Sequence, residues 1–277
     1  ALLDKLVKDD IITPTDSSEW VSPIVIVWKK TGEIRLCADL RTLNKHIVVD
    51  CHPLPKIHDL LANLGHAKYF SLLDLKSAYH QVPLAVESQD LTTFVTPFGA
   101  FKYSRLPFGL ASAASVFQKL MDSLLHNIEG VQAFQDDVLI FASSIQHHND
   151  ILKKVLTIFK ENGITLREDK CQFLQEKIDY LGHTLTHEGI VPKISLIKAI
   201  QEAKPQCDKD TLRSFLGLSE YYSRFVKGYA FIIQPLRNLL KKREKFIWSD
   251  SANEAFLTIK NSIISAPALS PFVPGVN

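Results

Sequence analysis

Two adjacent aspartates, Asp136 and Asp137, stand between two short apolar runs, residues 131–134 and 138–142. Both runs are rich in strand-forming residues, so this stretch predicts a hairpin with carboxylates at its tip. Two like charges held at a tight turn repel each other and lose hydration, which favours a divalent cation opposite them. Mg²⁺ is the ion we expect. A solvated Asp-Asp turn is the alternative for this pair taken alone.

A third carboxylate, Asp74, lies at the exit of the predicted strand 69–75. If the two strands are neighbours in one sheet, Asp74, Asp136 and Asp137 form the ligand set of a two-metal phosphoryl-transfer site. One ion would lower the pKa of an attacking hydroxyl, and the other would neutralise charge on a leaving pyrophosphate. Both ions need hard oxygen ligands, which aspartate supplies.

The elements that must position these residues follow from the pattern of apolar residues and breakers. We expect a hairpin over residues 22–40 with a basic tip, a helix over 57–64 that ends at Gly65, and a helical turn over 76–81. A second hairpin is predicted over 92–104, and an amphipathic helix over 110–125 leads into the aspartate hairpin.

The second half of the chain is mainly helical in its pattern. A helix over 149–162 is followed by two short strands, around Phe173 and over 180–184. Helices are predicted over 195–203, 210–227 and 235–242, the second capped by Asp208 or Asp210 and stopped by Gly228. A last helix runs from a Ser249 or Asp250 cap to about residue 264.

Composition limits the kind of protein that this can be. The 277 residues are 46% hydrophobic and 22% charged, which describes a globular chain of one large or two to three smaller folding units. No apolar run approaches the roughly 20 residues that span a bilayer, so we expect no membrane segment. Four cysteines stand far apart with no Cys-x-x-Cys pair, which favours a reducing compartment.

Charge is unevenly distributed along the sequence. The net charge is −4 over residues 1–150, +7 over 151–248 and −1 over 249–277. An acidic front half joined to a basic stretch suits a protein that holds metal in one part and the phosphates of a polyanion in another. A solvated helical surface is the alternative account of the basic stretch.

Six motifs occur together in one order, and that order carries a resemblance. They are Arg35-Leu-Cys-Ala-Asp-Leu-Arg-Thr-Leu-Asn-Lys45, Leu72-Leu-Asp-Leu-Lys-Ser-Ala-Tyr-His-Gln81, Leu106-Pro-Phe-Gly-Leu-Ala-Ser-Ala-Ala-Ser-Val-Phe-Gln118, Phe134-Gln-Asp-Asp137, Tyr180-Leu-Gly-His183 and Leu212-Arg-Ser-Phe-Leu-Gly-Leu-Ser-Glu-Tyr-Tyr-Ser-Arg-Phe225. The chain resembles the reverse transcriptases of gypsy-type LTR retrotransposons over nearly its whole length.

The resemblance implies an α/β (α+β) right-hand polymerase with an antiparallel palm sheet backed by helices. Interleaved fingers and palm would occupy residues 1–185, a helical thumb 190–245, and the start of a connection 246–277, before any RNase H region. It makes Asp74, Asp136 and Asp137 the catalytic metal ligands, with the backbone carbonyl of Leu75 as a further ligand. Two Mg²⁺ ions are expected, with Mn²⁺ as the alternative. Lys170 matches the general acid for pyrophosphate, although an exposed lysine on a polar turn accounts for it nearly as well.

The resemblance also implies substrate contacts. Lys29 or Lys30 and Arg35 would bind the triphosphate. Tyr79 would leave no volume for a ribose 2′-hydroxyl, and the loop containing Gly109 would lie under the nucleotide. The full implied set is, for the nucleotide, Lys29, Lys30, Arg35, Ala78, Tyr79, Phe108 and Gly109, and for primer and template, Gln135, Leu181, Gly182, His183, Arg213, Arg224 and Lys227.

Several residues depart from the pattern or stand outside it. Gln135 occupies a position that is commonly apolar in relatives, and Phe134 one where tyrosine is frequent. Ser112 and Ala114 also differ, which puts the start of the helix that follows in doubt. His147 and His148 are expected at the surface. Cys171, His183 and His187 lack the further ligands of a zinc site.

The activity implied is RNA- and DNA-templated extension of a primer with deoxynucleoside triphosphates. Two alternatives belong to other classes: a co-opted nucleic-acid-binding domain without catalysis, and a structural subunit of a polymerase complex. The resemblance places RNase H and integrase regions outside this chain, in the same polyprotein, and leaves a homodimer open. It implies a retroelement particle in the cytoplasm, with the nucleus as the alternative location, and no RNase H activity in this segment.

Overall fold

The computed structural model describes residues 2–28, 32, 34–206, 208–241, 245–267 and 269, without the side chain of Arg35. The described chain divides into two compact units that interleave along the sequence. The first, called here the sheet unit, contains Ala1–Lys56, Ser71–Phe141 and Ile145–Leu174. The second, called here the helical unit, contains Ile57–Phe70, Ala142–Ser144 and Gln175–Asn277. The names fingers, palm and thumb stay predictions.

A four-stranded sheet is the centre of the sheet unit. Its order is β7 (Val131–Phe134), β8 (Asp137–Ala142), β4 (Tyr69–Asp74) and β9 (Gln172–Gln175). The two inner strands are apolar runs, and Leu73, Val138, Leu139 and Ile140 have no exposed surface. β-Branched and large apolar residues suit strands that are buried on both faces.

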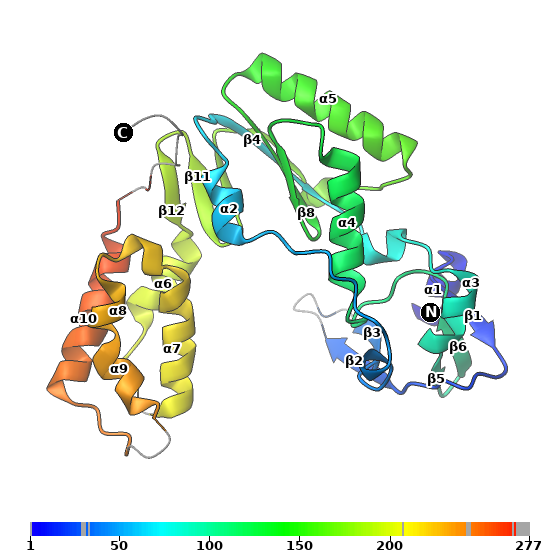
Figure 1. Ribbon diagram of the computed structural model, residues 1–277, viewed down its shortest axis with the longest axis horizontal. Helices are drawn as coiled ribbons and strands as arrows, with labels where there is room; N and C mark the ends of the chain where they lie inside the picture. The colour runs from blue at the N-terminus through cyan, green and yellow to red at the C-terminus, as the bar shows by residue number, and fades with distance from the viewer. Residues whose placement is uncertain are drawn as a thin grey trace. The chain divides into compact units, whose positions relative to one another are not determined.

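Helices α4 (Ala113–Leu125) and α5 (Ile145–Glu161) lie beside this sheet (Figure 1). The α4 helix packs against β7 with a buried stripe that includes Phe117 and Met121. Ile151 of α5 lies beside Gly130, which has a φ of +81° and no room for a Cβ atom. The close approach that this glycine allows fixes how the chain enters the aspartate hairpin.

The amino-terminal part of the sheet unit has a smaller sheet with its own core. Strand β6 (Gly99–Tyr103) lies between β1 (Ile12–Thr15) and β5 (Phe94–Thr96), antiparallel to both. Ile12, Leu40, Phe94 and Tyr103 are buried in this core, and Leu3 and Leu6 of α1 (Leu2–Lys8) pack against it. Strands β2 (Ile24–Trp28) and β3 (Ile34–Ala38) form a separate two-stranded ribbon, and a short helix, α3, covers Val86–Gln89.

The helical unit combines a three-stranded sheet with a group of helices. The sheet is β10 (Lys177–Tyr180), β11 (His183–Thr186) and β12 (Gly189–Pro192). The helices are α2 (Ile57–Ala62), α6 (Ile194–Glu202), α7 (Lys209–Tyr221), α8 (Tyr229–Ile232), α9 (Gln234–Leu239) and α10 (Asp250–Ile264). The α10 helix contacts α6, α7, α8 and α9, as Figure 1 shows.

Three sequence predictions about this architecture are wrong. The single strand expected over residues 180–184 is instead the end of β10 and the start of β11, with a turn at Leu181 and Gly182 between them. The helix expected over residues 210–227 ends at Tyr221, and Arg224 lies instead in a 3₁₀ turn, Ser223–Phe225. The cause is tertiary, because Tyr222 is buried and its hydroxyl donates to the Gly182 carbonyl, 2.6 Å away. His148, expected at the surface, is fully buried and hydrogen-bonded to Ser71 at 2.9 Å.

Candidate active site

The sheet brings the three predicted aspartates together. Asp74 is the last residue of β4, and Asp137 is the first residue of the neighbouring strand β8. Asp136 precedes Asp137 in the turn, and its carbonyl accepts a hydrogen bond from the Leu75 N–H at 3.1 Å. The adjacency of the two strands, on which the predicted metal site depended, is therefore confirmed.

The turn that presents the aspartates has a constrained backbone. Phe134 and Asp137 are paired across the strands, so Gln135 and Asp136 are the two residues of the loop. Gln135 has a φ of +53°, and Asp136 is not among the residues with positive φ. This sign pattern is that of a type II′ turn, which usually has glycine at its first position. A side chain there costs on the order of 1 kcal/mol.

The raised pKa of Asp137 reflects a concentration of negative charge around it. Burial, and then the charges of Asp74 and Asp136, raise the pKa of Asp137 to about 6 from its ordinary value of 3.8. The positive charge of Lys170 opposes this shift only in part. An opposite charge at this point would relieve both the repulsion and the desolvation.

The chemistry of the three carboxylates fits a divalent cation, but their arrangement is not a closed coordination shell. Among the residues that the structure describes, no group of three His, Cys, Asp or Glu side chains is placed to hold a metal ion. Asp74 instead has the Arg167 guanidinium near it, with 3.8 Å between Nε and Oδ1. The aspartates are thus neighbours that bound cations would have to draw into one ligand set.

A cavity of about 420 Å³ lies beside these residues within the sheet unit. Asp74 and Asp136 line it together with Arg167, Lys170 and Phe108. Lys5 and Asp9, from α1 and the residue following it, also face this cavity. The cavity therefore combines carboxylates with cations, as a site for a metal-bound polyphosphate requires.

The residues predicted to surround a nucleotide lie next to this cavity. Ala78 is buried, and Tyr79 lies in the 3₁₀ turn Ala78–Gln81, which follows β4. The Tyr79 ring is 5.0 Å from the ring of Phe108 and 5.6 Å from that of Phe117, measured between centroids. Burial, and then the charge of Asp136, raise the pKa of its phenol. The ring is thus held by packing close to the aspartates.

The loop around Gly109 is shaped by one side chain that sequence reasoning did not single out. Gly109 has a φ of +91°. Asn44 donates to the Gly109 carbonyl at 2.9 Å and accepts from the Ala111 N–H at 2.8 Å.

Of the predicted triphosphate contacts, Lys29 and Lys30 lie outside the described residues. Arg35 pairs with Val27 in the β2–β3 ribbon, and its side chain lies outside the described part.

Two buried or partly buried glutamines were also missed as site residues. Gln81 donates to the carbonyls of Lys76 and Thr165, at 2.7 and 3.0 Å, and accepts from the Thr165 N–H. It thereby joins the segment after Asp74 to the segment before Arg167. Gln118 makes a similar bridge at the aspartate turn. The available signal was a polar residue on the apolar stripe of α4.

The predicted primer and template contacts other than Gln135 belong to the helical unit. Leu181 and Gly182 form the turn between β10 and β11, with φ values of +43° and +69°. The hydroxyl of Tyr221 donates to the Leu181 carbonyl, and that of Tyr222 to the Gly182 carbonyl. His183 is only 2% exposed, and burial lowers the pKa of its imidazole. Its ring packs against aromatic residues rather than facing solvent.

The three predicted phosphate contacts differ in how accessible they are. Arg213, on α7, forms an ion pair with Asp210. The Arg224 guanidinium lies 5.7 Å from the centroid of the Phe225 ring, and burial lowers its pKa. Lys227 is exposed. Because α7 ends at Tyr221, these cations do not share one helix as predicted.

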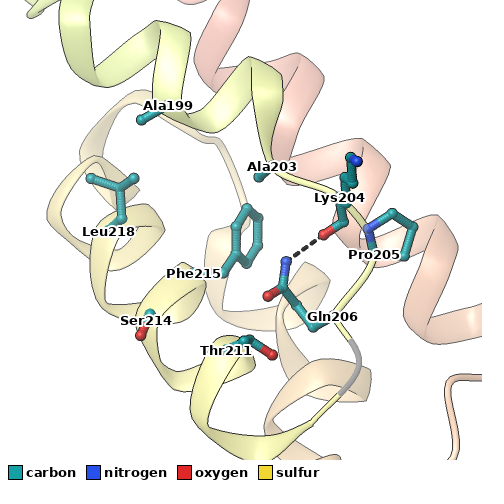
Figure 2. Close-up of a pocket in the computed structure, with 9 residues that line it drawn as sticks. All are labelled: Ala199, Ala203, Lys204, Pro205, Gln206, Thr211, Ser214, Phe215 and Leu218. Atoms are coloured by element: carbon teal, nitrogen blue, oxygen red, sulfur yellow. Dashed lines mark hydrogen bonds between the residues drawn. The ribbon is translucent and has the colours of Figure 1, made fainter.

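The helical unit has a pocket of a different kind (Figure 2). It measures about 530 Å³ and lies between α6 and α7, where Ala199, Ala203, Phe215 and Leu218 supply apolar walls. The side chain of Gln206 donates to the Lys204 carbonyl at its edge. Among the described residues that line this pocket there is no carboxylate, so it lacks the metal ligands that the aspartate site offers.

Comparison with solved structures defines the class of protein. The fold is that of the retroviral reverse transcriptases. A foamy viral protease-reverse transcriptase in complex with double-stranded DNA matches 99% of this chain and 58% of its own, with a TM-score of 0.91 and 26% identity. The foamy viral protein in complex with an RNA/DNA hybrid matches 97% of this chain and 37% of its own, with a TM-score of 0.87 and 26% identity.

The sequence comparisons agree with the structural ones. A model of the family described as reverse transcriptase (RNA-dependent DNA polymerase) matches residues 27–185. The chain belongs to this family. It is 37% identical to the retrovirus-related Pol polyprotein from transposon 412 of Drosophila melanogaster, over 97% of this chain and 22% of that protein. It is 35% identical to the one from transposon gypsy of the same organism, over 94% and 27%.

These relatives are much longer than the chain described here. The chain spans about a quarter of their length, and 19% of the Tf2-3 transposon polyprotein of Schizosaccharomyces pombe, to which it is 31% identical over 90% of this chain. The gypsy-type resemblance of the six motifs is thus confirmed. Within the described residues, no helix is both long and apolar enough to cross a bilayer.

Proposed function

We propose that the chain extends a nucleic-acid primer with deoxynucleoside triphosphates, copying RNA or DNA by two-metal phosphoryl transfer. The observation that carries this proposal is the meeting of Asp74, Asp136 and Asp137 on neighbouring strands beside a cavity that also holds Arg167 and Lys170. The family supplies the reaction class, and the solved relatives that hold duplex DNA and an RNA/DNA hybrid support the substrates.

The three aspartates, with the Leu75 carbonyl, are the residues that would hold two Mg²⁺ ions, or Mn²⁺ in their place. Bound there, the ions would activate the primer hydroxyl and neutralise the departing pyrophosphate. Reverse transcriptases generally use divalent metal ions. The raised pKa of Asp137 supports this assignment, since it reports negative charge that the fold leaves only partly compensated.

The chain's own groups would bind and orient the nucleotide. Arg167 and Lys170 would contact the phosphates from the cavity wall, and Lys170 would supply a proton to pyrophosphate. The loop containing Phe108 would lie against the base and sugar. Tyr79, held by Phe108 and Phe117, would present a rigid ring towards the sugar 2′ position.

Primer extension on matched RNA and DNA templates tests this function directly. Loss of a metal ligand removes several kcal/mol of transition-state stabilisation, so we expect Asp136→Asn or Asp137→Asn to slow extension by about 10²- to 10⁴-fold. Asp150→Asn, at an exposed position of α5, is the matched control and should extend at the parental rate. Parental rates in both site variants would refute the mechanism.

The same assay separates the proposed enzyme from its two alternatives. A co-opted binding domain or a structural subunit would bind primer–template duplex without Mg²⁺-dependent extension. The described carboxylates favour the enzyme, because binding alone does not require three of them at one point.

Tyr79 gives a second test, on sugar selection. Tyr79→Ala would open volume beside the sugar, so discrimination against ribonucleotides should fall by at least about tenfold. Tyr79→Phe keeps the ring and should keep the discrimination, which makes it the matched control. The measurement is the ratio of kcat/KM for dNTP and rNTP. An unchanged ratio in Tyr79→Ala would contradict the assignment.

A further inference from the structure

The apolar stripe of α4 contains one fully buried polar side chain, Gln118. Its neighbours on the buried face are Phe117 and Met121. A buried amide costs free energy unless its donors and acceptor are all used. What Gln118 bonds to therefore shows what it stabilises.

Both ends of this amide are hydrogen-bonded to the aspartate hairpin. Gln118 Oε1 accepts from the Gln135 N–H at 3.1 Å, and Nε2 donates to the Ala133 carbonyl at 3.0 Å. Ala133 belongs to β7, and Gln135 is the first residue of the turn. One side chain thus clamps the end of the strand to the residue directly before Asp136 and Asp137.

The turn needs such support because of its backbone. Gln135 has a φ of +53°, a conformation that glycine adopts readily and other residues resist. Relaxation of Gln135 would rotate the peptide that carries Asp136. A hydrogen bond to the Gln135 N–H opposes that rotation and keeps the carboxylates in place.

Two further residues reinforce the direction in which the Gln118 amide faces. The second N–H of Nε2 donates to Asp122 Oδ1 at 2.8 Å, and a carboxylate can only accept. Asp122 Oδ2 lies 2.7 Å from His52 Nε2. A flipped amide would set two acceptors against each other at Asp122. His52, Asp122 and Gln118 therefore form a directed chain of hydrogen bonds that ends at the aspartate turn.

We propose that Gln118 is a positioning residue for the catalytic aspartates and that the His52–Asp122 pair reinforces its orientation. The proposal rests on the proposed function, because it assigns the aspartates to metal binding. Gln118 does not touch the reacting atoms. Its effect would reach the reaction through the geometry of Asp136 and Asp137.

The first experiment replaces the amide with an apolar side chain of similar length. Gln118→Met should lower kcat by about 10- to 100-fold and raise the Mg²⁺ concentration for half-maximal activity. The KM for dNTP and the Kd for primer–template duplex should change by less than about twofold. Gln89→Met is the matched control. Among the described contacts, the side chain of Gln89 bonds to the Leu84 carbonyl and to no residue of the aspartate hairpin, so this variant should leave all four quantities unchanged.

Variants of the two partly exposed residues in this chain of hydrogen bonds test the inference with less risk of misfolding. The side chains of His52 and Asp122 are 25% and 41% exposed, so their variants should fold. Asp122→Asn removes the carboxylate that reinforces the direction of the Gln118 amide, and His52→Phe removes the ring nitrogen that pairs with Asp122. Each should reduce kcat by about 3- to 10-fold, with His52→Gln restoring part of the loss. In the double variant Gln118→Met/Asp122→Asn, kcat should equal that of Gln118→Met alone.

A metal-binding readout separates this inference from the proposed function. Mg²⁺ should raise the Tm of the parent more than that of Gln118→Met. If Mg²⁺ raises the Tm of the parent more than that of Gln118→Met but the parent extends no primer, the proposed function is refuted and the positioning role is supported. Parental kcat, or a parental Tm shift with Mg²⁺, in folded Gln118→Met would overturn the inference. So would losses from Gln118→Met and Asp122→Asn that multiply in the double variant.

Discussion

The ionised side chain of Asp137 destabilises the folded protein. Burial and two neighbouring carboxylates raise its pKa to about 6, so the folded state resists its ionisation more than the unfolded state does. At pH 7 the side chain is ionised in both states, and the cost is fully present. Between about pH 6 and pH 4 the folded state takes up the proton first, and the cost disappears. Functional groups that destabilise their own fold are common in enzymes.

Removing this charge should therefore stabilise the metal-free protein. In EDTA at pH 7.5 we expect Asp137→Asn to raise the free energy of unfolding by roughly 1–2 kcal/mol, after allowance for solvent screening of a partly exposed group. The gain should vanish near pH 4. Urea denaturation of the parent, the variant and the control Asp150→Asn measures it. A destabilised Asp137→Asn at pH 7.5 would contradict the electrostatic argument.

At the same scale, the aspartates themselves were predictable and their support was not. Adjacent charges between two apolar runs, and a carboxylate at the end of a third, are local signals in the sequence. The bond from the Gln135 N–H to Gln118 joins residues 17 apart, and that from Ser71 to His148 joins residues 77 apart. Neither follows from periodicity, because both depend on how distant elements pack.

Among the elements, turns and helix ends departed most from prediction. The start of α7 follows the local signal, since Asp208 accepts from the N–H groups of Asp210 and Thr211. Its end does not, because the bond from Tyr222 to Gly182 spans 40 residues. Strand β1 and helix α1 were not predicted from the sequence. Ile12 of β1 is buried, and Leu3 and Leu6 of α1 are partly buried, in a core completed by strands that come about 90 residues later.

Two glycines of the helical unit should respond in opposite directions to the same substitution by alanine, because one lies in a turn and the other in a helix. In Gly182→Ala the φ of +69° is strained, and the new Cβ atom would lie 3.0 Å from the Tyr221 ring. We expect a loss of about 1–3 kcal/mol in stability. Gly217 lies inside α7 with nothing near its Cβ position, so Gly217→Ala should gain about 0.5–1 kcal/mol.

Thermal or urea unfolding of both variants measures this difference. The two substitutions add the same methyl group, so a common effect on solubility or expression cancels between them. Equal stability of the two variants would show that the turn tolerates a side chain and that the contact with Tyr221 adjusts freely.

On the scale of the whole molecule, the two units are compact but not continuous in sequence. Residues 57–70 belong to the helical unit, although the chain on either side of them belongs to the sheet unit. This segment brings the buried residues Leu60, Leu61 and Leu64. The sequence predicted the segment's helix from its spacing but contained no local signal for the unit it would join.

A fragment of residues 175–277 should therefore be less stable than the same region in the full chain. Each fully buried leucine contributes about 1.5–3 kcal/mol, and the fragment loses three of them. Adding a peptide of residues 57–70 should raise the Tm of the fragment, and the same peptide with Leu61→Asp should not. A fragment with the full-length Tm and no response to the peptide would contradict this account.

The interleaving also has a consequence for the order in which the protein can fold during synthesis. When Phe70 leaves the ribosome, the segment from Gln175 onward, with which residues 57–70 form a unit, has not yet been made. About 100 residues separate the two, which corresponds to roughly 5–20 s of translation. During that interval the leucines of α2 lack the rest of their unit. A nascent chain halted before residue 175 should thus be a better chaperone substrate than one that has passed it.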